Sequence, residues 1–185
     1  MRTVILDRDG VINQDSDAFI KSPDEWIPIP GSLAAIARLH HRGWRIVVAS
    51  NQSGIARGLF DLNTLAAIHS KMCRLAIEAG GLIDAIFFCP SANNNHPDRK
   101  PNPGMLLDLI QRVNCTPTSL FMIGDAARDI QAAVAVGVKP ILVKTGKGQL
   151  TLQEWKGAID FPICNDISAA VDYLLFRHSN DEHDK

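Results

Sequence analysis

The sequence lacks the features that mark membrane, secreted or nucleic-acid-binding proteins. No apolar stretch approaches the roughly twenty residues that span a bilayer, and we expect no signal peptide, because the first apolar run begins almost at once. The formal net charge is only -1, from 19 basic and 20 acidic residues that are interspersed. Such a balance gives no electrostatic reason to expect nucleic acid or an anionic membrane as the main partner. We therefore expect a cytoplasmic protein that binds neither nucleic acid nor a membrane.

Cysteine is also scarce, and its positions contain no Cys-x-x-Cys pair: Cys73, Cys89, Cys115 and Cys164. Neither a disulfide framework nor a zinc knuckle is therefore indicated. A domain of this length buries about 70% of its unfolded surface, so it needs no such crosslink for stability. We expect a single, monomeric domain over residues 1–177, followed by a polar tail over residues 178–185.

Short apolar or β-branched runs alternate with stretches of helical periodicity. The runs cover residues 4–6, 45–49, 83–88, 120–123 and 140–144, and this alternation predicts an α/β fold with a parallel sheet. The intervals between successive runs have room for little beyond one helix each, so no separate cap domain is expected. Substrate selection must then depend on the loops over residues 13–29, 52–60 and 89–101.

Capping residues predict where several helices begin and end. Asp61 and Asp166 are expected to cap helices at their N-termini, Asn102 with Pro103 announces another, and residues 151–154 fit a capping box. Helices are accordingly expected over about residues 32–42, 61–80, 126–137, from 102 onward and after 166.

Two acids, Asp7 and Asp9, directly follow the first apolar run. Ligands of an open parallel sheet bind beyond the carboxyl ends of its strands, where an acid pair can hold a divalent cation beside a nucleophile. A turn at Gly10 can redirect the second carboxylate above the first. The alternative is that both acids only cap a turn.

Two further segments carry groups suited to phosphate. Residues 50–58 supply the Ser50 hydroxyl, amides, glycines and Arg57, which can each meet phosphate oxygens, although a plain polar turn is the alternative. Arg99 and Lys100 precede a helix start, where Lys100 can offset repulsion between a phosphate and an attacking carboxylate. A solvated basic pair is the competing interpretation.

A fourth buried run ends at Asp125, and Asp129 follows four residues later. Asp125 is a candidate metal ligand. It could equally cap the helix that follows, with Asp129 in the first helical turn, and both roles are compatible.

Taken in order, these motifs resemble those of the haloacid dehalogenase (HAD) superfamily. The strings DRDGVIN, NQSGIARG, RKPNPGM and GD are similar to its branch of D-glycero-D-manno-heptose 1,7-bisphosphate phosphatases and histidinol-phosphate phosphatases. The resemblance covers roughly the first four fifths of the chain. It implies a three-layer, doubly wound parallel sheet of the α/β class without a separate cap domain.

The resemblance also implies a mechanism and a set of site residues. Asp7 would be the nucleophile that forms an aspartyl-phosphate, while Asp9 would protonate the leaving oxygen and then activate water. Mg²⁺ would be held by the Asp7 carboxylate, the Asp9 backbone carbonyl and Asp125. Ser50 and Lys100 would stabilise the phosphoryl group. The residues expected to bind substrate are Asn13, Asp15, Ser50, Asn51, Gln52, Ser53, Arg57, Arg99 and Lys100.

Two departures from the branch are visible. Many of its members carry a zinc loop of three Cys and one His, but here only Cys89 and His96 remain, so structural zinc is not expected. The branch commonly has Lys after the metal-binding acid, where this chain has Ala126, so one phosphate-side cation is expected to be missing.

The resemblance implies Mg²⁺-dependent removal of the C7 phosphate from a sugar phosphate, D-glycero-D-manno-heptose 1,7-bisphosphate. Histidinol phosphate is an alternative substrate, because Asp15, Asp17 or Asp24 could bind its ammonium group. A noncatalytic module that binds a phosphorylated ligand is a second alternative, and the complete set of Asp7, Asp9, Lys100 and Asp125 argues against it. A dehalogenase is disfavoured because such enzymes lack the second acid that is present here as Asp9.

Overall fold

Six strands pair into one parallel sheet in the computed structural model, which describes residues 2–181. The strand order is β3-β2-β1-β4-β5-β6. The strands are β1 (Thr3–Leu6), β2 (Arg45–Asn51), β3 (Ala85–Cys89), β4 (Leu120–Gly124), β5 (Lys139–Val143) and β6 (Ile163–Cys164). The first five confirm the apolar runs identified in the sequence. Strand β6 was not predicted, because two residues are too few to display a period.

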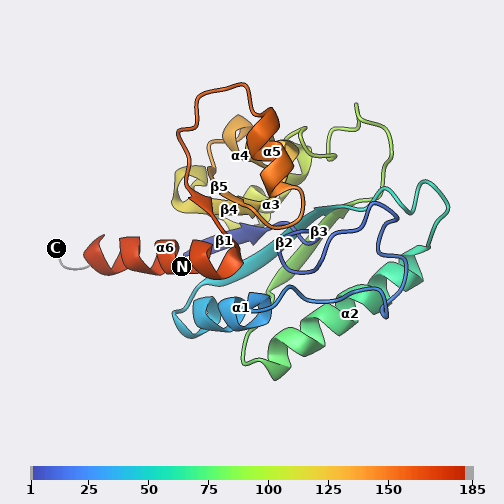
Figure 1. The fold of residues 1–185 in the computed structure, drawn as a ribbon, viewed down its shortest axis with the longest axis horizontal. Coiled ribbons are helices and arrows are strands. Elements are labelled where there is room, and N and C mark those ends of the chain that lie inside the picture. The colour runs from blue at the N-terminus through green and yellow to red at the C-terminus, as the bar shows by residue number, and fades with distance from the viewer. Residues whose placement is uncertain (1, 182–185) are drawn as a thin grey trace.

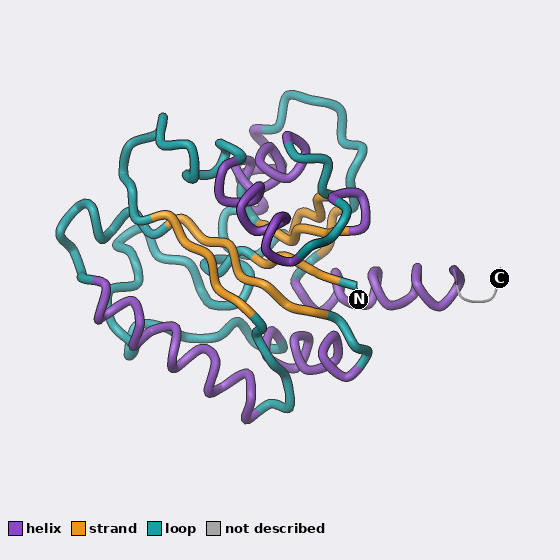
Figure 2. Tube along the Cα trace, turned by 180° about the vertical axis from the view of Figure 1, so that it is seen from behind, coloured by secondary structure: helices purple, strands orange, loops and turns teal. Residues whose placement is uncertain are grey.

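Helices cover both faces of the sheet, as Figures 1 and 2 show from opposite sides. Helices α1, α2 and α6 pack on one face, while α3 and α4 pack on the other. Their bounds are α1 (Ser32–His41), α2 (Leu62–Glu78), α3 (Gly104–Val113), α4 (Ala127–Ala135), α5 (Gly148–Glu154) and α6 (Ile167–Asp181), with a 3-10 turn at Pro117–Ser119. The expected three-layer, doubly wound architecture is confirmed, and residues 2–181 contain no inserted cap domain.

The alternation of side chains along β1 decides which face receives the first catalytic candidate. Val4 and Leu6 belong to the core under α1, α2 and α6, whereas Ile5 belongs to the core under α3 and α4. Since successive side chains of a strand point to opposite faces, Asp7 continues the direction of Ile5, toward α3 and α4.

Helix capping was predicted correctly at two positions. The Asp61 carboxylate accepts a hydrogen bond from the backbone N–H of Thr64 (2.7 Å) at the start of α2. The Asp166 carboxylate accepts one from Ala169 (2.8 Å) in α6. Each bond satisfies a backbone donor that the helix itself leaves free.

Two other capping predictions are wrong. The residue that caps α3 is Pro103, and the Asn102 amide instead donates to the backbone oxygens of Asn94 and His96. The predicted box at residues 151–154 lies inside α5, where the Thr151 hydroxyl donates to the backbone oxygen of Asp125 (2.9 Å). In Asn102 a bond within the preceding loop replaces the local capping bond, and in Thr151 a bond to a residue 26 positions earlier does so.

The last helix continues past the expected start of the polar tail. Helix α6 extends to Asp181, so residues 178–181 are helical, and residues 182–185 lie outside the described part of the chain. The division into one domain over residues 1–177 and a tail stays a prediction.

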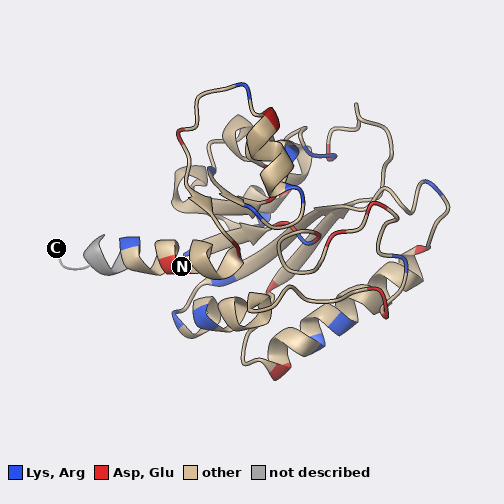
Figure 3. Ribbon diagram, in the orientation of Figure 1, with Lys and Arg blue, Asp and Glu red and all other residues tan. Residues whose placement is uncertain are grey.

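No helix among the described residues is long and apolar enough to cross a membrane. Segments that carry acidic and basic residues occur on both sides of the sheet (Figure 3).

Candidate active site

The carboxyl ends of three neighbouring strands bring the candidate catalytic residues together. Strand β1 lies between β2 and β4 and runs parallel to both. Asp7 follows β1, Ser50 lies at the end of β2, and Asp125 follows β4. From β1 the chain proceeds outward to β2 and β3 and then returns to form β4 on the other side. Such a switch in strand order is where open parallel sheets bind ligands.

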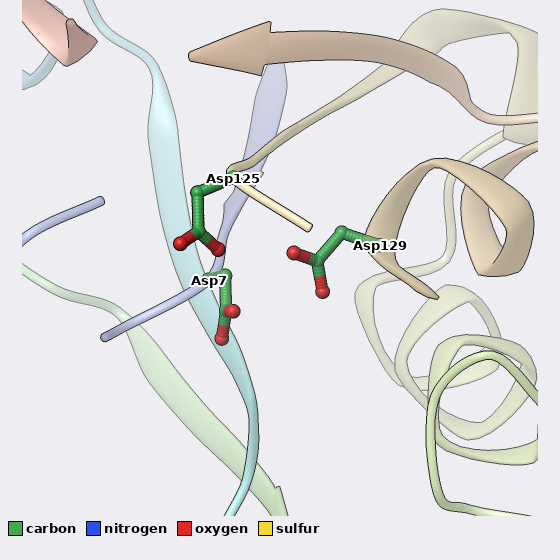
Figure 4. Close-up of side chains that lie close together, drawn as sticks. All are labelled: Asp7, Asp125 and Asp129. Carbon is green, nitrogen blue, oxygen red and sulfur yellow. The ribbon is translucent and has the colours of Figure 1, made fainter. Parts of the chain in front are cut away.

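Three acids form the centre of the site. The carboxylates of Asp7, Asp125 and Asp129 offer oxygen atoms that all lie within 4.8 Å of one another, and Figure 4 shows the three side chains close together. Asp129 comes from the first turn of α4, where its Oδ2 also accepts a hydrogen bond from the backbone N–H of Ala126 (3.1 Å). Among the described residues, this is the one group of three or more side chains suited to hold a metal ion.

A buried lysine lies against two of these acids. The Lys100 Nζ is 3.0 Å from Asp7 Oδ1 and 2.8 Å from Asp129 Oδ1, and it donates to the backbone oxygen of Ala49 (2.6 Å). Its side chain is fully shielded from solvent. Burial alone would lower the pKa of Lys100, but Asp129 and Asp7 outweigh it and raise that pKa. Lys100 is therefore a fixed positive charge beside Asp7.

One cation does not neutralise the cluster, and the pKa values of the acids reflect this. Burial, with repulsion from Asp129, raises the pKa of Asp7 to about 6. Burial, with repulsion from Asp129 and Asp7, raises the pKa of Asp125 to about 8. The Oδ1 of Asp125 is buried without a hydrogen-bond partner among the described residues. A hard divalent cation would meet this oxygen and relieve the repulsion, so the donor set fits Mg²⁺.

The loop between β5 and α5 holds Asp125 in place. The backbone N–H of Lys147 donates to Asp125 Oδ2 (2.7 Å). The Thr145 hydroxyl donates to the backbone oxygen of Gly10 (2.6 Å), which ties this loop to the turn after β1. Gly10 has a φ of +81°, and a Cβ atom there would collide with the Asp125 carboxylate. Only glycine therefore allows the turn to pass this close to the acid.

The second acid of the first motif has different surroundings. The Asp9 carboxylate accepts hydrogen bonds from the Arg8 guanidinium, from the Asn13 amide (2.9 Å) and from the Gln52 amide (3.0 Å). Burial alone would raise the pKa of Asp9, but Arg8 and these amides outweigh it and lower that pKa. The Asp9 side chain lies outside the three-acid cluster.

Two residues at the end of β2 connect the parts of the site. The Gln52 amide donates to the Ser50 hydroxyl (2.7 Å) as well as to Asp9. The Asn51 side chain donates to the backbone oxygen of Lys100 (2.8 Å) and accepts from its N–H (3.1 Å). Asn51 thus fixes the backbone that presents the buried lysine.

A cleft of about 220 Å³ opens beside Asp9. Its walls carry the charged residues Asp9, Asp15, Asp17, Arg57, Arg99, Arg128 and Lys147, together with Asn51, Gln52 and Ser53. Most of the residues predicted to bind substrate therefore line this cleft, whereas Ser50 and Lys100 lie outside its walls and Asn13 contacts Asp9. The larger groove of about 1030 Å³ along the edge strand β3 contains none of the three clustered acids.

Arg128 and Asp129 were not predicted to be site residues in these roles. Arg128 lines the cleft, and its Nε is buried without a hydrogen-bond partner among the described residues. Burial would lower its pKa, but Asp129, Asp7 and Asp125 outweigh it and raise that pKa. A basic side chain thus lies on the cleft wall two residues after Ala126, where a cation was expected to be missing. The sequence feature that could have identified Arg128 is its position as a basic residue in the helical turn after Asp125.

The remnant of the zinc loop lies apart from this cluster. The Cys89 Sγ is buried and lies 3.7 Å from His96 Nδ1. His96 Nδ1 also accepts the backbone N–H of Asp98 (3.2 Å), which helps to hold the loop before Lys100.

Comparisons with known proteins give concordant matches. A HAD-hydrolase-like family model matches residues 98–170. The chain is 51% identical over 176 residues to a D-glycero-beta-D-manno-heptose-1,7-bisphosphate 7-phosphatase of Bordetella bronchiseptica, covering 95% of this chain and 98% of that protein. A protein of the same name from Pseudomonas aeruginosa is 51% identical over 175 residues, covering 93% and 97%.

Solved structures agree. The crystal structure of D,D-heptose 1.7-bisphosphate phosphatase from B. bronchiseptica, complexed with magnesium and phosphate, superposes with a TM-score of 0.93 at 50% identity. The match covers 96% of this chain and 99% of that one. The corresponding phosphatase from Burkholderia thailandensis gives a TM-score of 0.77 at 44% identity, covering 95% and 99%.

Proposed function

The chain belongs to the D-glycero-beta-D-manno-heptose-1,7-bisphosphate 7-phosphatases of the HAD superfamily, and from this premise we propose that it hydrolyses the C7 phosphate of that sugar bisphosphate in a Mg²⁺-dependent reaction. The observation that carries the proposal is the cluster of Asp7, Asp125 and Asp129, two of which contact the buried Lys100, next to a cleft that carries Asp9 and four basic side chains.

In the first proposed step a carboxylate oxygen of Asp7 attacks the phosphorus atom. The bond between phosphorus and the C7 oxygen of the sugar breaks, and the departing oxygen takes a proton from Asp9. Asp7 is suited to attack because Lys100 holds its Oδ1 at 3.0 Å and its other oxygen is not committed to that lysine.

In the second proposed step water attacks the phosphorus atom of the aspartyl-phosphate. Asp9 accepts the proton of the water, the bond between Asp7 and phosphorus breaks, and inorganic phosphate leaves. Asp9 can serve both steps because the first leaves it ionised and ready to act as a base. At the end of the cycle Asp7 is again a free carboxylate and Asp9 again carries a proton, so bonds and protons balance.

Mg²⁺ supplies positive charge that allows an anionic phosphate to approach the anionic Asp7. We assign its protein ligands to the carboxylates of Asp7 and Asp125 and the backbone carbonyl of Asp9. Asp129 lies close enough to Asp7 and Asp125 to be a further ligand or to accept hydrogen bonds from water that the ion would carry. The Ser50 hydroxyl and Lys100 stabilise the transferring phosphoryl group, and Arg128 is a further cation on the cleft wall.

The charges of the cleft favour a bisphosphate over histidinol phosphate. Arg57 and Arg99 line the cleft and suit the second phosphate. Asp15 and Asp17, which could bind an ammonium group, already face the Lys147 ammonium at 3.7 and 3.4 Å. A cytoplasmic monomer without a nucleic-acid partner is part of the same proposal.

The test is Mg²⁺-dependent phosphate release from heptose 1,7-bisphosphate and histidinol phosphate in parallel, with comparison of kcat/KM. We expect a strong preference for the heptose and no turnover by D7N. A preference for histidinol phosphate would contradict the substrate assignment. Turnover by D7N would contradict the mechanism.

A further inference from the structure

Arg8 lies between the two acids of the first motif and is fully buried. A guanidinium in a protein interior is costly unless it is paired and hydrogen-bonded. Its neighbours on both sides, Asp7 and Asp9, are the proposed nucleophile and the proposed acid and base. The burial of a permanent charge at this position therefore needs an explanation in terms of what the guanidinium holds.

The guanidinium of Arg8 forms a fork on the Asp9 carboxylate. Arg8 Nε lies 3.1 Å from Asp9 Oδ1, and Nη2 lies 3.0 Å from Oδ1 and 2.9 Å from Oδ2. A planar guanidinium fixes both oxygens of a carboxylate, and with them the plane of the carboxyl group. The arginine side chain is 1% exposed, while that of Asp9 is 20% exposed. The fork thus approaches from the protein interior and leaves part of the carboxylate accessible.

Single amides could not fix this orientation alone. Asn13 contacts Oδ1 and Gln52 contacts Oδ2, each through one hydrogen bond. Two such bonds from flexible side chains tolerate rotation of the carboxyl group, whereas the fork sets its plane. His69 of α2 lies near the same guanidinium, and burial and the charge of Arg8 lower the pKa of His69 to about 4. Near neutral pH this histidine is uncharged and does not compete for Asp9.

The backbone of Arg8 has a separate function. Its N–H donates to Asp7 Oδ1 (2.8 Å), and its carbonyl oxygen accepts from Ile12 (2.8 Å) and Asn13 (3.2 Å). These bonds form the turn after β1 and do not depend on the side chain. A substitution of Arg8 can therefore remove the fork and leave the bonding pattern of the turn.

We propose that Arg8 is a positioning residue of the phosphatase, whose guanidinium sets the direction in which the Asp9 carboxylate faces the leaving oxygen of the substrate. The inference rests on the proposed function, since it assumes that Asp9 delivers the proton to that oxygen. Lysine cannot replace arginine here, because an ammonium is a point charge without a planar fork.

The experiment compares kcat/KM of wild type and R8K on two substrates. A simple alkyl phosphate has a poor leaving group that needs a proton, whereas p-nitrophenyl phosphate has one that does not. We expect R8K to lower kcat/KM about tenfold or more on the alkyl phosphate, a fraction of the effect of losing a general acid. On p-nitrophenyl phosphate we expect a change below about threefold. Both values come from one preparation, so their ratio is independent of the folded fraction.

Two controls separate positioning from general damage. In a D9N background R8K should cause no further loss on the alkyl phosphate, because the group that Arg8 orients is no longer an acid. R45K makes the same exchange at the start of β2, where Arg45 donates to the backbone oxygen of Val113 (2.8 Å). It should leave both kcat/KM values near those of wild type. If R8K does not fold, R8Q carries the same comparison without a buried charge.

Equal losses on both substrates, or an additive loss in the D9N background, would overturn the positioning role. The heptose bisphosphate is assayed beside the two simple substrates. Failure of wild type on the heptose alone would contradict the proposed substrate, yet the ratio for R8K would still decide the role of Arg8.

Discussion

His69 makes the stability of the protein depend on pH in a way that can be calculated. The residue lies on α2, its Nε2 is buried without a hydrogen-bond partner among the described residues, and its ring packs edge-on against Phe88. Burial and the charge of Arg8 lower the pKa of His69 from 6.5 to about 4, with a smaller opposing effect of Asp9. Protonation of the ring therefore opposes folding.

The sign and size of the effect follow from linkage. Below pH 6.5 the unfolded chain binds a proton at this position that the folded protein does not bind until pH falls to about 4. The stability that the protein has with His69 uncharged is thus fully present above pH 6.5, and it is lost as pH falls toward 4. At pH 5 the unfolded histidine is almost fully protonated and the folded one only slightly. The folded state is then less stable than at pH 7 by about 2 kcal/mol from this residue alone.

Urea unfolding of wild type and H69Q at pH 7 and pH 5, followed by circular dichroism, tests the calculation. Other titrating groups affect both proteins equally. The measured quantity is therefore the difference in free energy of unfolding between wild type and H69Q, and how this difference changes from pH 7 to pH 5. We expect H69Q to gain about 2 kcal/mol relative to wild type between pH 7 and pH 5. The control is I68V at the adjacent buried position, which should cost about 1 kcal/mol at both pH values. An unchanged difference between wild type and H69Q would contradict the lowered pKa of His69.

Four further outcomes are expected at the acid cluster. D7N should abolish phosphate release and keep a cooperative melting curve, and residual turnover would contradict its role as nucleophile. K100M should lower the free energy of unfolding by about 3–5 kcal/mol, because it leaves Asp7 and Asp129 without their buried cation; urea titration measures this. Mg²⁺ at about 100 times its dissociation constant should stabilise wild type by about 2.7 kcal/mol, and D125A should remove most of the accompanying rise in Tm. S50A should raise the activation free energy by about 3 kcal/mol, which lowers kcat by about two orders of magnitude.

The sequence was sufficient for the elements whose signals are local. Apolar runs mark five strands, which are four to seven residues long, and the parallel arrangement then requires their carboxyl ends to share one edge. Asp7, Ser50 and Asp125 could therefore be expected to meet, although they are far apart in the chain. Their proximity follows from strand direction and needs no knowledge of individual contacts.

The parts that the sequence did not reveal depend on long-range contacts. Asp129 fits the first turn of a helix as well as it fits a metal site, so its type and position do not distinguish the two. Thr151 matches a capping box, but in the fold its hydroxyl donates from within α5 to the backbone oxygen of Asp125. The roles of Arg8 and Arg128 depend on which carboxylates lie beside them, which only the three-dimensional arrangement decides.

The two acids of the first motif illustrate how neighbours decide function. Asp7 and Asp9 are both buried, and burial alone would raise both pKa values. Asp7 faces two other carboxylates and its pKa is raised, whereas Asp9 faces a guanidinium and two amides and its pKa is lowered. These directions are the reverse of what the first step needs, because a nucleophile attacks as the ionised carboxylate and a general acid must carry its proton. Mg²⁺ held by Asp7 and Asp125 would favour the ionised form of Asp7. The lowered pKa of Asp9 suits the second step, in which Asp9 accepts a proton from water, so the fork from Arg8 favours the base form of Asp9.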